Sequence, residues 1–140
     1  EDLAGLVQAT GLAGRVTMTG GLEPAQVAEW IGASDVLTLP SWSEGYPNVV
    51  VEGIACGRPV VATAVGGTGE IIKAGNGILV PPRDAAALEH GLADALARTW
   101  DAAAVSASVS RGWGDVAADT LAICRQVLGV SDGDVCLGRA

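Results

Sequence analysis

The sequence predicts an α/β fold in which helices cover both faces of a parallel sheet. Short apolar runs alternate along the chain with segments of helical periodicity. The runs are continuously apolar, which is typical of strands buried on both faces. Hydrophobic residues make up 49% of the 140-residue chain and charged residues 17%, which excludes a disordered polar chain and suits one domain of ordinary size.

Glycine, proline and asparagine delimit the elements expected in the first part of the chain. Gly11 suits the left-handed position after a helix end, and Pro24 suits a first helical turn. Asn48 is expected to be the N-cap of a helix that runs to Cys56. The helices predicted here are 2–10, 24–32 and 48–56, and the strands are 15–19 and 35–39.

The second part continues the same alternation and ends in helices. Pro59 is tolerable only near the start of its strand, and Asp84 is expected to cap a long helix. The predicted strands are 58–63 and 77–80, and the predicted helices are 70–73, 84–98, 101–110 and 113–128. We expect one domain over 1–128 and a frayed tail over 129–140, where no periodicity remains.

Charge and cysteine content restrict the partners and the compartment. Eight basic residues against 16 acidic ones give a net charge of -8, which repels phosphate backbones, so no nucleic-acid partner is expected. Three cysteines without a CxxC pair favour a reducing, cytoplasmic location. No signal peptide is expected, and the most apolar region, 49–65, is interrupted by charges and a proline, so it does not predict a membrane span.

The loop over 40–48, PSWSEGYPN, is the most informative segment. Parallel sheets bind ligands at the carboxyl ends of their strands, so the loops to consider are 20–23, 40–48 and 64–69. Gly45 allows close approach of the backbone to a ligand. The helix that follows directs N–H groups and a partial positive charge toward the loop, which predicts a phosphate site.

Two glutamates accompany this predicted phosphate site. Glu44 lies in the loop and Glu52 one turn into the helix, and carboxylates accept hydrogen bonds from hydroxyl pairs. Glu52 stands in an apolar stretch, VVVEGIA, where a buried charge would need a partner or ligand. A phosphate site between two such carboxylates suits a nucleotide sugar. The alternative for Glu44 is a solvated loop acid.

The segment EGYPNVVVE resembles the E-x7-E signature of retaining GT-B glycosyltransferases, especially glycosyltransferase family 4. The surrounding segments DVLTL, GRPVVATAVGGTGE and GNGILVPPRD are similar to that family's motifs in the same order. The resemblance covers roughly residues 3–130. It implies the C-terminal half of a GT-B fold, a Rossmann-like parallel sheet with helices on both faces, with the first strand missing.

The resemblance also implies a role for each site residue. Glu44, the catalytic candidate, would contact hexose hydroxyls near the reacting carbon, and Glu52 would hold the ribose hydroxyls. Backbone amides of the intervening loop would line the hexose and the diphosphate. Hexosyl transfer would retain the anomeric configuration through an oxocarbenium-like front-face step, with no metal and no other cofactor. The donor-binding set is Gly45, Tyr46, Pro47, Asn48, Val49 and Glu52, of which Tyr46 and Pro47 are equally explained by loop packing.

The sequence lacks two features that the family has on the N-terminal side of the matching segment. The family's diphosphate-binding Arg and Lys, and its N-terminal acceptor domain, have no counterpart in this sequence. We therefore expect a fragment that binds the donor but is inactive alone. The acceptor, a sugar or lipid in polysaccharide or glycoconjugate synthesis, would bind through the missing N-terminal domain, as would any peripheral membrane contact.

Other functions remain open at this point. A non-catalytic sugar-nucleotide-binding scaffold fits the missing half, and a sugar-nucleotide epimerase shares the architecture. A phosphorylase would need a cofactor lysine, and Lys73, the only lysine, is misplaced for that role.

Several polar residues are expected to have structural explanations. Glu70 is assigned to capping of the short helix rather than to facing the site, His90 to a helix away from the site and Trp42 to packing rather than sugar stacking. Asp132 and Asp134 match a metal-binding D-x-D pattern by chance in the tail.

Overall fold

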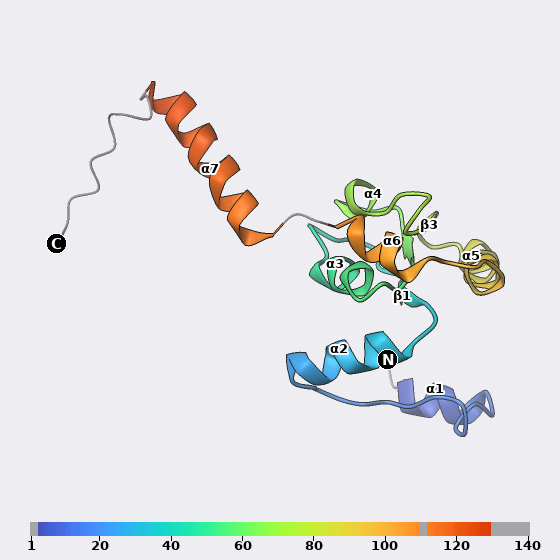
Figure 1. Cartoon of the computed structure of the whole chain (residues 1–140). Helices are drawn as coiled ribbons and strands as arrows, with labels where there is room; N and C mark the ends of the chain where they lie inside the picture. The colour runs from blue at the N-terminus through green and yellow to red at the C-terminus, as the bar shows by residue number, and fades with distance from the viewer. Residues whose placement is uncertain (1–2, 110–111, 130–140) are drawn as a thin grey trace.

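The computed structural model describes residues 3–109 and 112–129 and contains one parallel sheet of three strands (Figure 1). The strands are β1 (Leu37–Leu39), β2 (Val60–Thr63) and β3 (Gly77–Val80), in the order β1-β2-β3. Their order and direction confirm the predicted parallel α/β architecture.

The register of the strands brings their carboxyl ends to one edge. Leu39 of β1 lies beside Ala62 of β2, which lies beside Leu79 of β3. The loops 40–47, 64–67 and 81–84 therefore leave the sheet along the same edge. This is the edge at which parallel sheets bind ligands.

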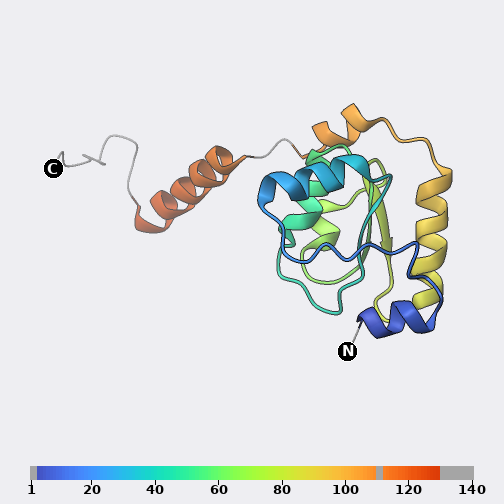
Figure 2. The ribbon, with the colours of Figure 1, turned by 90° about the horizontal axis from the view of Figure 1, so that it is seen from below.

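Helices cover both faces of the sheet, as predicted (Figure 2). One face carries α3 (Asn48–Ala55), the short α4 (Thr68–Ile71) and α6 (Ala102–Ala107). The other face carries α5 (Ala85–Ala97). Two further helices, α1 (Leu3–Ala9) and α2 (Pro24–Ala33), precede the sheet, and α2 contacts α3.

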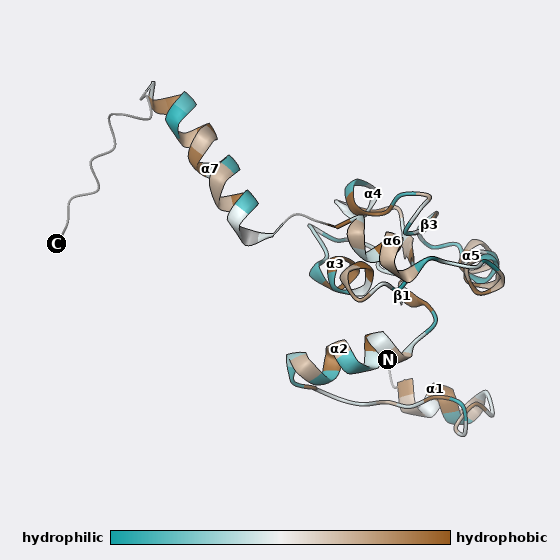
Figure 3. Ribbon diagram, viewed as in Figure 1, coloured by the Kyte–Doolittle hydropathy of each residue, from teal (hydrophilic) through white to brown (hydrophobic). Residues whose placement is uncertain are grey.

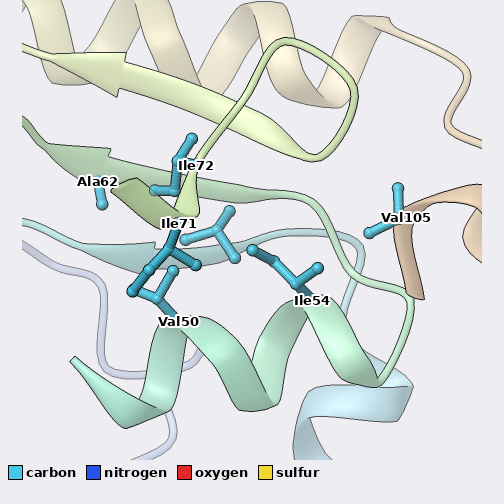
Figure 4. Packing of buried hydrophobic residues seen from close by; sticks show 7 residues of the cluster. Val50, Ile54, Ala62, Ile71, Ile72 and Val105 are labelled. Atoms are coloured by element: carbon cyan, nitrogen blue, oxygen red, sulfur yellow. The ribbon is translucent and has the colours of Figure 1, made fainter. Parts of the chain in front are cut away.

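Successive residues of β2 fill two cores on opposite faces. Val60 and Ala62 pack with α3, α4 and α6, while Val61 packs with α5. Figure 4 shows the first of these cores, in which Val50 and Ile54 of α3 point toward the sheet. All four residues of β2 are buried, which explains why this segment is apolar without alternation.

Several predicted helix boundaries are confirmed. Gly11 follows α1 with a φ of 70°, and Pro24 is the first residue of α2. The Asp84 carboxylate accepts a hydrogen bond from the Ala87 amide at 2.9 Å and so caps α5. Asp101 caps α6 in the same way, through the amides of Ala103 and Ala104.

The prediction of Asn48 as the N-cap of α3 is wrong. Asn48 is the first helical residue, and Pro47 occupies the N-cap position with φ −75° and ψ 107°. Proline has a φ near this value and no N–H, so it can precede a helix without losing a hydrogen bond. Its side chain offers no acceptor, and no side chain caps this helix.

The predicted strand over 15–19 is also absent from the described structure. Residues 11–15 form turns, and the extended segment after them pairs with none of the three strands. Its side chains are exposed, including Met18 at 58%. A strand is stable only when a neighbour completes its hydrogen-bond ladder, so apolar composition alone does not produce one here.

The short helix α4 begins two residues before the predicted start because Thr68 stabilises the turn. The buried Thr68 hydroxyl contacts the carbonyls of Thr63 and Val65 and accepts a hydrogen bond from the Val65 amide. The helix predicted over 101–110 is observed as α6 and is shorter, although position 110 lies outside the described residues.

The last helix, α7 (Trp113–Leu128), extends away from the sheet and ends at Gly129, which has a φ of 66° (Figures 1 and 2). Polar and apolar residues intermix along it, as Figure 3 shows. Among the described residues, no helix combines the length and apolarity needed to cross a membrane. The tail predicted over 129–140 lies outside the described residues beyond position 129.

Gly91 allows α5 to lie close to the sheet, and this contact can be tested. A Cβ atom at Gly91 would lie 2.8 Å from Val80 Cγ1 and 3.2 Å from Val61 Cγ1. We predict that Gly91→Ala lowers the free energy of unfolding by about 1–3 kcal/mol through overpacking, despite alanine's better helix propensity. Urea unfolding followed by circular dichroism measures the change.

Gly114→Ala in α7 is the matched control, because outside its own helix no atom of the described residues lies within 4 Å of the added Cβ. This variant should be at least as stable as the parent, since only the helix propensity changes. Equal stability of the two variants would show that Gly91 does not control the packing of α5.

Candidate functional site

A cleft of about 680 Å³ lies beside the carboxyl edge of the sheet. It is bounded by the 40–48 loop, by α3 and α4, and by the first turn of α7. Three of the predicted site residues, Tyr46, Asn48 and Glu52, line it together. The full lining is Tyr46, Asn48, Val51, Glu52, Glu70, Gly112 and Val116.

Glu52 lies on the exposed side of α3 and faces the cleft. The expectation that it is buried in an apolar stretch is wrong. Val50, Gly53 and Ile54 are the buried residues of this helix, and a residue two positions from Val50 points to a different side. Glu52 also borders a second, largely apolar hollow of about 440 Å³ between α2 and α3. Its carboxylate is therefore accessible to a ligand.

Glu44 is half-buried at the base of the loop and does not line the cleft. Its Oε1 accepts a hydrogen bond from the Ser41 hydroxyl at 2.6 Å. The Ser41 carbonyl in turn accepts a hydrogen bond from the Thr63 hydroxyl at the end of β2, at 2.5 Å. These two bonds connect the Glu44 carboxylate to the sheet and restrict its orientation.

Gly66 and Gly67 pack directly against the backbone of the Glu44 loop. The Gly67 amide donates a hydrogen bond to the Gly45 carbonyl at 2.7 Å. Gly66 has a φ of 50°, and a Cβ there would overlap the carbonyl oxygen of Glu44. A Cβ on Gly67 would lie 2.8 Å from the Gly45 carbonyl oxygen. Neither position can carry a side chain unless the loop moves.

The start of α3 is suited to an anion. Because Pro47 provides no side-chain acceptor, the first amides of α3 receive no side-chain cap. Free amides and the helix dipole together attract a negatively charged group. The Pro47 side chain is buried, and Val49 packs against the core, so only the backbone of these two predicted site residues is available to a ligand.

Glu70 lines the cleft, so its assignment as a helix cap is wrong. Gly67 occupies the N-cap position of α4, and Glu70 lies within the first turn with an exposed side chain. The GG-x-x-E spacing contains the signal that would have identified it. Glu70 follows closely after the glycine pair that contacts the Glu44 loop, so it lies near that loop.

Three other lining residues were missed. Val51 is the helical neighbour of Glu52, and Gly112 and Val116 come from the start of α7, about sixty positions later in the chain. Nothing in the sequence connects α7 with the 40–48 loop. His90 is exposed on α5, where its Nδ1 lies 2.7 Å from the Ala86 carbonyl, and it does not border the cleft.

Within the described residues, no group of three or more His, Cys, Asp or Glu side chains could hold a metal ion. Asp132 and Asp134, which form the D-x-D pattern, lie outside these residues. Metal-independent chemistry stays a prediction.

The contact between the glycine pair and the Glu44 loop leads to a second prediction. Gly66→Ala should displace the loop, because the new Cβ would overlap Glu44 and because alanine disfavours a positive φ. We expect shifted amide resonances for 44–46 and a loss of about 1–3 kcal/mol in stability. Gly69→Ala is the control, since its nearest neighbour would be Leu79 Cδ1 at 3.9 Å. Unchanged loop resonances in Gly66→Ala would contradict the contact.

Comparison with known proteins identifies relatives over most of the chain. Residues 1–99 match the family model of the glycosyl transferases group 1. The D-inositol 3-phosphate glycosyltransferase of Arthrobacter sp. (strain FB24) is 36% identical over 130 residues, which cover 86% of this chain and 30% of that protein.

Solved structures share the fold. Sucrose-phosphate synthase from Thermosynechococcus elongatus aligns with a TM-score of 0.74 and 33% identity, covering 92% of this chain and 34% of that one. HepE from Anabaena, in complex with UDP, aligns with a TM-score of 0.71 and 26% identity, covering 92% of this chain and 36% of that one.

This chain therefore spans about a third of the length of these relatives. Its Rossmann-like parallel sheet corresponds to part of their GT-B architecture. With the family match over most of its length and a curated relative above 30% identity, the chain belongs to the glycosyl transferases group 1.

Proposed function

We propose that this chain is the donor-binding half of a retaining glycosyltransferase of family 4 and binds a nucleotide-diphosphate sugar. The observation that carries the proposal is the uncapped start of α3 between two carboxylates, Glu44 and Glu52. The structures of HepE with UDP and with UDP-glucose support it, because they belong to relatives of the same fold.

The proposed phosphate position is the start of α3. The backbone around Gly45 is exposed there, and the helix amides lack a side-chain cap. Free N–H groups at a helix start stabilise the negative charge of a diphosphate, and this stabilisation grows as the leaving group gains charge.

The two glutamates would bind the two hydroxyl-rich ends of the donor. Glu52 on the open side of α3 would accept hydrogen bonds from the ribose. Glu44, held by Ser41 on one oxygen, would direct the other toward the hexose hydroxyls. Tyr46 and Asn48, which share the cleft with Glu52, would contact the donor between them.

The proposed transfer is hexosyl transfer with retention. The bond from the anomeric carbon to the diphosphate oxygen breaks, and the acceptor hydroxyl forms its bond on the same face. The hydroxyl proton goes to the departing phosphate oxygen. The contribution of this chain is to hold the hexose and to stabilise the leaving diphosphate through the amides of α3.

The charge of the cleft suggests what the remainder of a longer protein would supply. Glu52 and Glu70 line the cleft, and no basic residue lines it among the residues that the structure describes. The chain as a whole has a net charge of -8. The cations for a diphosphate bound here are proposed to come from an additional part of a longer protein. Acceptor recognition is proposed to come from the same additional part.

Donor binding is testable on the chain itself. Calorimetric titration with UDP, ADP and GDP should reveal binding of at least one nucleotide. Glu52→Gln should weaken it about tenfold, because a carboxylate-to-hydroxyl hydrogen bond contributes about 1.5–3 kcal/mol. Glu89→Gln, an exposed substitution on α5 outside the cleft, is the control and should bind as the parent does. Equal affinities of both variants would exclude the assigned ribose site.

The proposal also predicts that the 140-residue chain alone transfers no sugar, because none of the described residues that line the cleft is basic. An assay with UDP-, ADP- or GDP-hexoses and polyol acceptors should show no product above background. A longer protein that contains this chain should regain transfer, and Glu44→Gln should reduce its turnover at unchanged fold. Transfer by the 140-residue chain alone would contradict the proposal that an additional part of a longer protein is needed for catalysis.

A non-catalytic sugar-nucleotide-binding module is the second candidate, and the lack of basic side chains in the described part of the lining favours it. The two functions differ in the longer protein. Nucleotide binding without any turnover would support the binding module, and formation of a glycosylated acceptor would exclude it.

A further inference from the structure

Trp42 and Arg83 form a cation–π pair at the carboxyl edge of the sheet, outside the lining of the donor cleft. The Arg83 Cζ lies 5.1 Å from the centroid of the Trp42 ring. Trp42 comes from the loop after β1 and Arg83 from the loop after β3. The pair therefore connects the loops that follow the two outer strands of the sheet, past the end of the central strand β2.

Trp42 lies at the tip of the turn that orients the Glu44 carboxylate. The hydrogen bond from the Ser41 hydroxyl to Glu44 Oε1 closes this turn. Only Trp42 and Ser43 stand between the two bonded residues. A displacement of the tip therefore moves Glu44, because the closed turn has only two residues to absorb the displacement.

Two hydrogen bonds hold the ends of this turn from the side of β2. The Ser41 carbonyl accepts a hydrogen bond from the Thr63 hydroxyl. The Gly45 carbonyl, just after the turn, accepts one from the Gly67 amide. Neither bond reaches the tip. The contact with Arg83 comes from the side of β3 and restrains the tip as well.

Core packing does not hold the Trp42 ring, as a comparison with the second arginine–tryptophan pair shows. Trp42 is 73% exposed, and its indole N–H has no hydrogen bond within residues 3–109 and 112–129. Arg98 lies 4.6 Å from the Trp100 centroid, but Trp100 is half-buried and packs against both cores. The Trp100 indole N–H also donates to the Ala95 carbonyl at 2.8 Å. Trp100 would thus stay in place without its arginine, whereas Trp42 would not.

The backbone holds Arg83 in an unfavourable conformation. Its φ of 62° is the only positive value at a non-glycine residue in the described part of the chain. Pro81 and Pro82 precede it, and the N-cap Asp84 follows it, so both sides of the turn are restrained. Glycine would adopt this φ without strain. A strained arginine leads to the hypothesis that its side chain has a use.

The contact with Trp42 is the one described use of the Arg83 side chain. Its guanidinium has no hydrogen bond or ion pair with any described residue. Arg83 is also the only basic residue in the three loops at this edge, 40–47, 64–67 and 81–84. No other cation of these loops can replace it on the ring.

We propose that Arg83 is a positioning residue that holds Glu44 in its donor-binding orientation through Trp42. This inference rests on the proposed function, in which Glu44 contacts the hexose and Glu52 the ribose. Arg83 contacts neither sugar and acts on the turn alone. Its loss therefore weakens the contribution of the hexose to donor affinity and leaves the contribution of the nucleotide unchanged.

The first test uses the 140-residue chain without a ligand. Arg83→Gly removes the contact with Trp42 and also relieves the positive φ. We expect shifted amide resonances and lower heteronuclear NOE values for residues 42–44, which report faster backbone motion. The urea midpoint should be no lower than that of the parent, so a folding defect cannot account for the change. Arg98→Gln, which disrupts the other arginine–tryptophan pair, is the matched control and should leave residues 42–44 unchanged.

The second test measures what the hexose adds to affinity. The chain is titrated with UDP and UDP-glucose, and with the corresponding ADP and GDP pairs. Arg83→Gly should lower the ratio of UDP-glucose affinity to UDP affinity about two- to fivefold, the factor to which an exposed cation–π contact corresponds. Trp42→Ala should give the same loss. Arg83→Lys retains both a cation and the strained backbone, and it should keep most of the ratio.

A double-mutant cycle shows whether Arg83 acts through Glu44. Glu44→Ala removes the assigned hexose contact and should lower the same affinity ratio by itself. Adding Arg83→Gly to Glu44→Ala should then cause no further loss, because no carboxylate remains to be positioned.

Three outcomes would overturn the inference: unchanged resonances of residues 42–44 in Arg83→Gly, an unchanged affinity ratio in that variant, or additive losses in the double variant. Failure of the proposed function gives a different result. A parent chain that binds none of the nucleotide pairs would reject the donor function, and the shifted resonances would still support the restraint of the turn by Arg83. Donor binding with unchanged resonances in Arg83→Gly would reject the positioning role alone.

Discussion

The backbone contact between the loops after β1 and β2 is the constraint on which the rest of the site depends. Parallel register brings these loops to one edge, and the Gly67 amide bonds to the Gly45 carbonyl across the gap. The contact requires glycine at 66 and 67, because a side chain at either would collide with the Glu44 loop. The position of Glu44, and the start of α3 after it, follow from this contact.

The same arrangement produces a site with an incomplete set of charges. Amides at the start of α3 suit a phosphate, and the cleft beside them contains acidic but no basic side chains among the described residues. An isolated cleft of this kind stabilises a diphosphate only in part, because helix amides contribute partial charges. The single cation of the neighbouring loops, Arg83, lies on Trp42 outside the cleft.

Local sequence patterns predicted the strands correctly where a neighbouring strand completes the hydrogen-bond ladder. The apolar runs over 60–63 and 77–80 became strands because each has a partner on at least one side. The run over 15–19, RVTMT, also contains β-branched residues but did not become a strand, because no strand pairs with it in the described structure. The N-cap was predicted correctly at Asp84, whose side chain lies next to the start of α5. The N-cap prediction at Asn48 was wrong, because Pro47 occupies the cap position of α3.

The sequence by itself determined the α/β class and the alternation of elements and indicated the 40–48 loop as the candidate site, because these depend on local periodicity and on short motifs. Only the tertiary structure decided which residues meet. The rotation of α3 exposed Glu52, α4 directed Glu70 into the cleft, and β3 brought Arg83 onto Trp42. Such contacts join residues tens of positions apart, and they follow from strand order and helix packing, which no local pattern records.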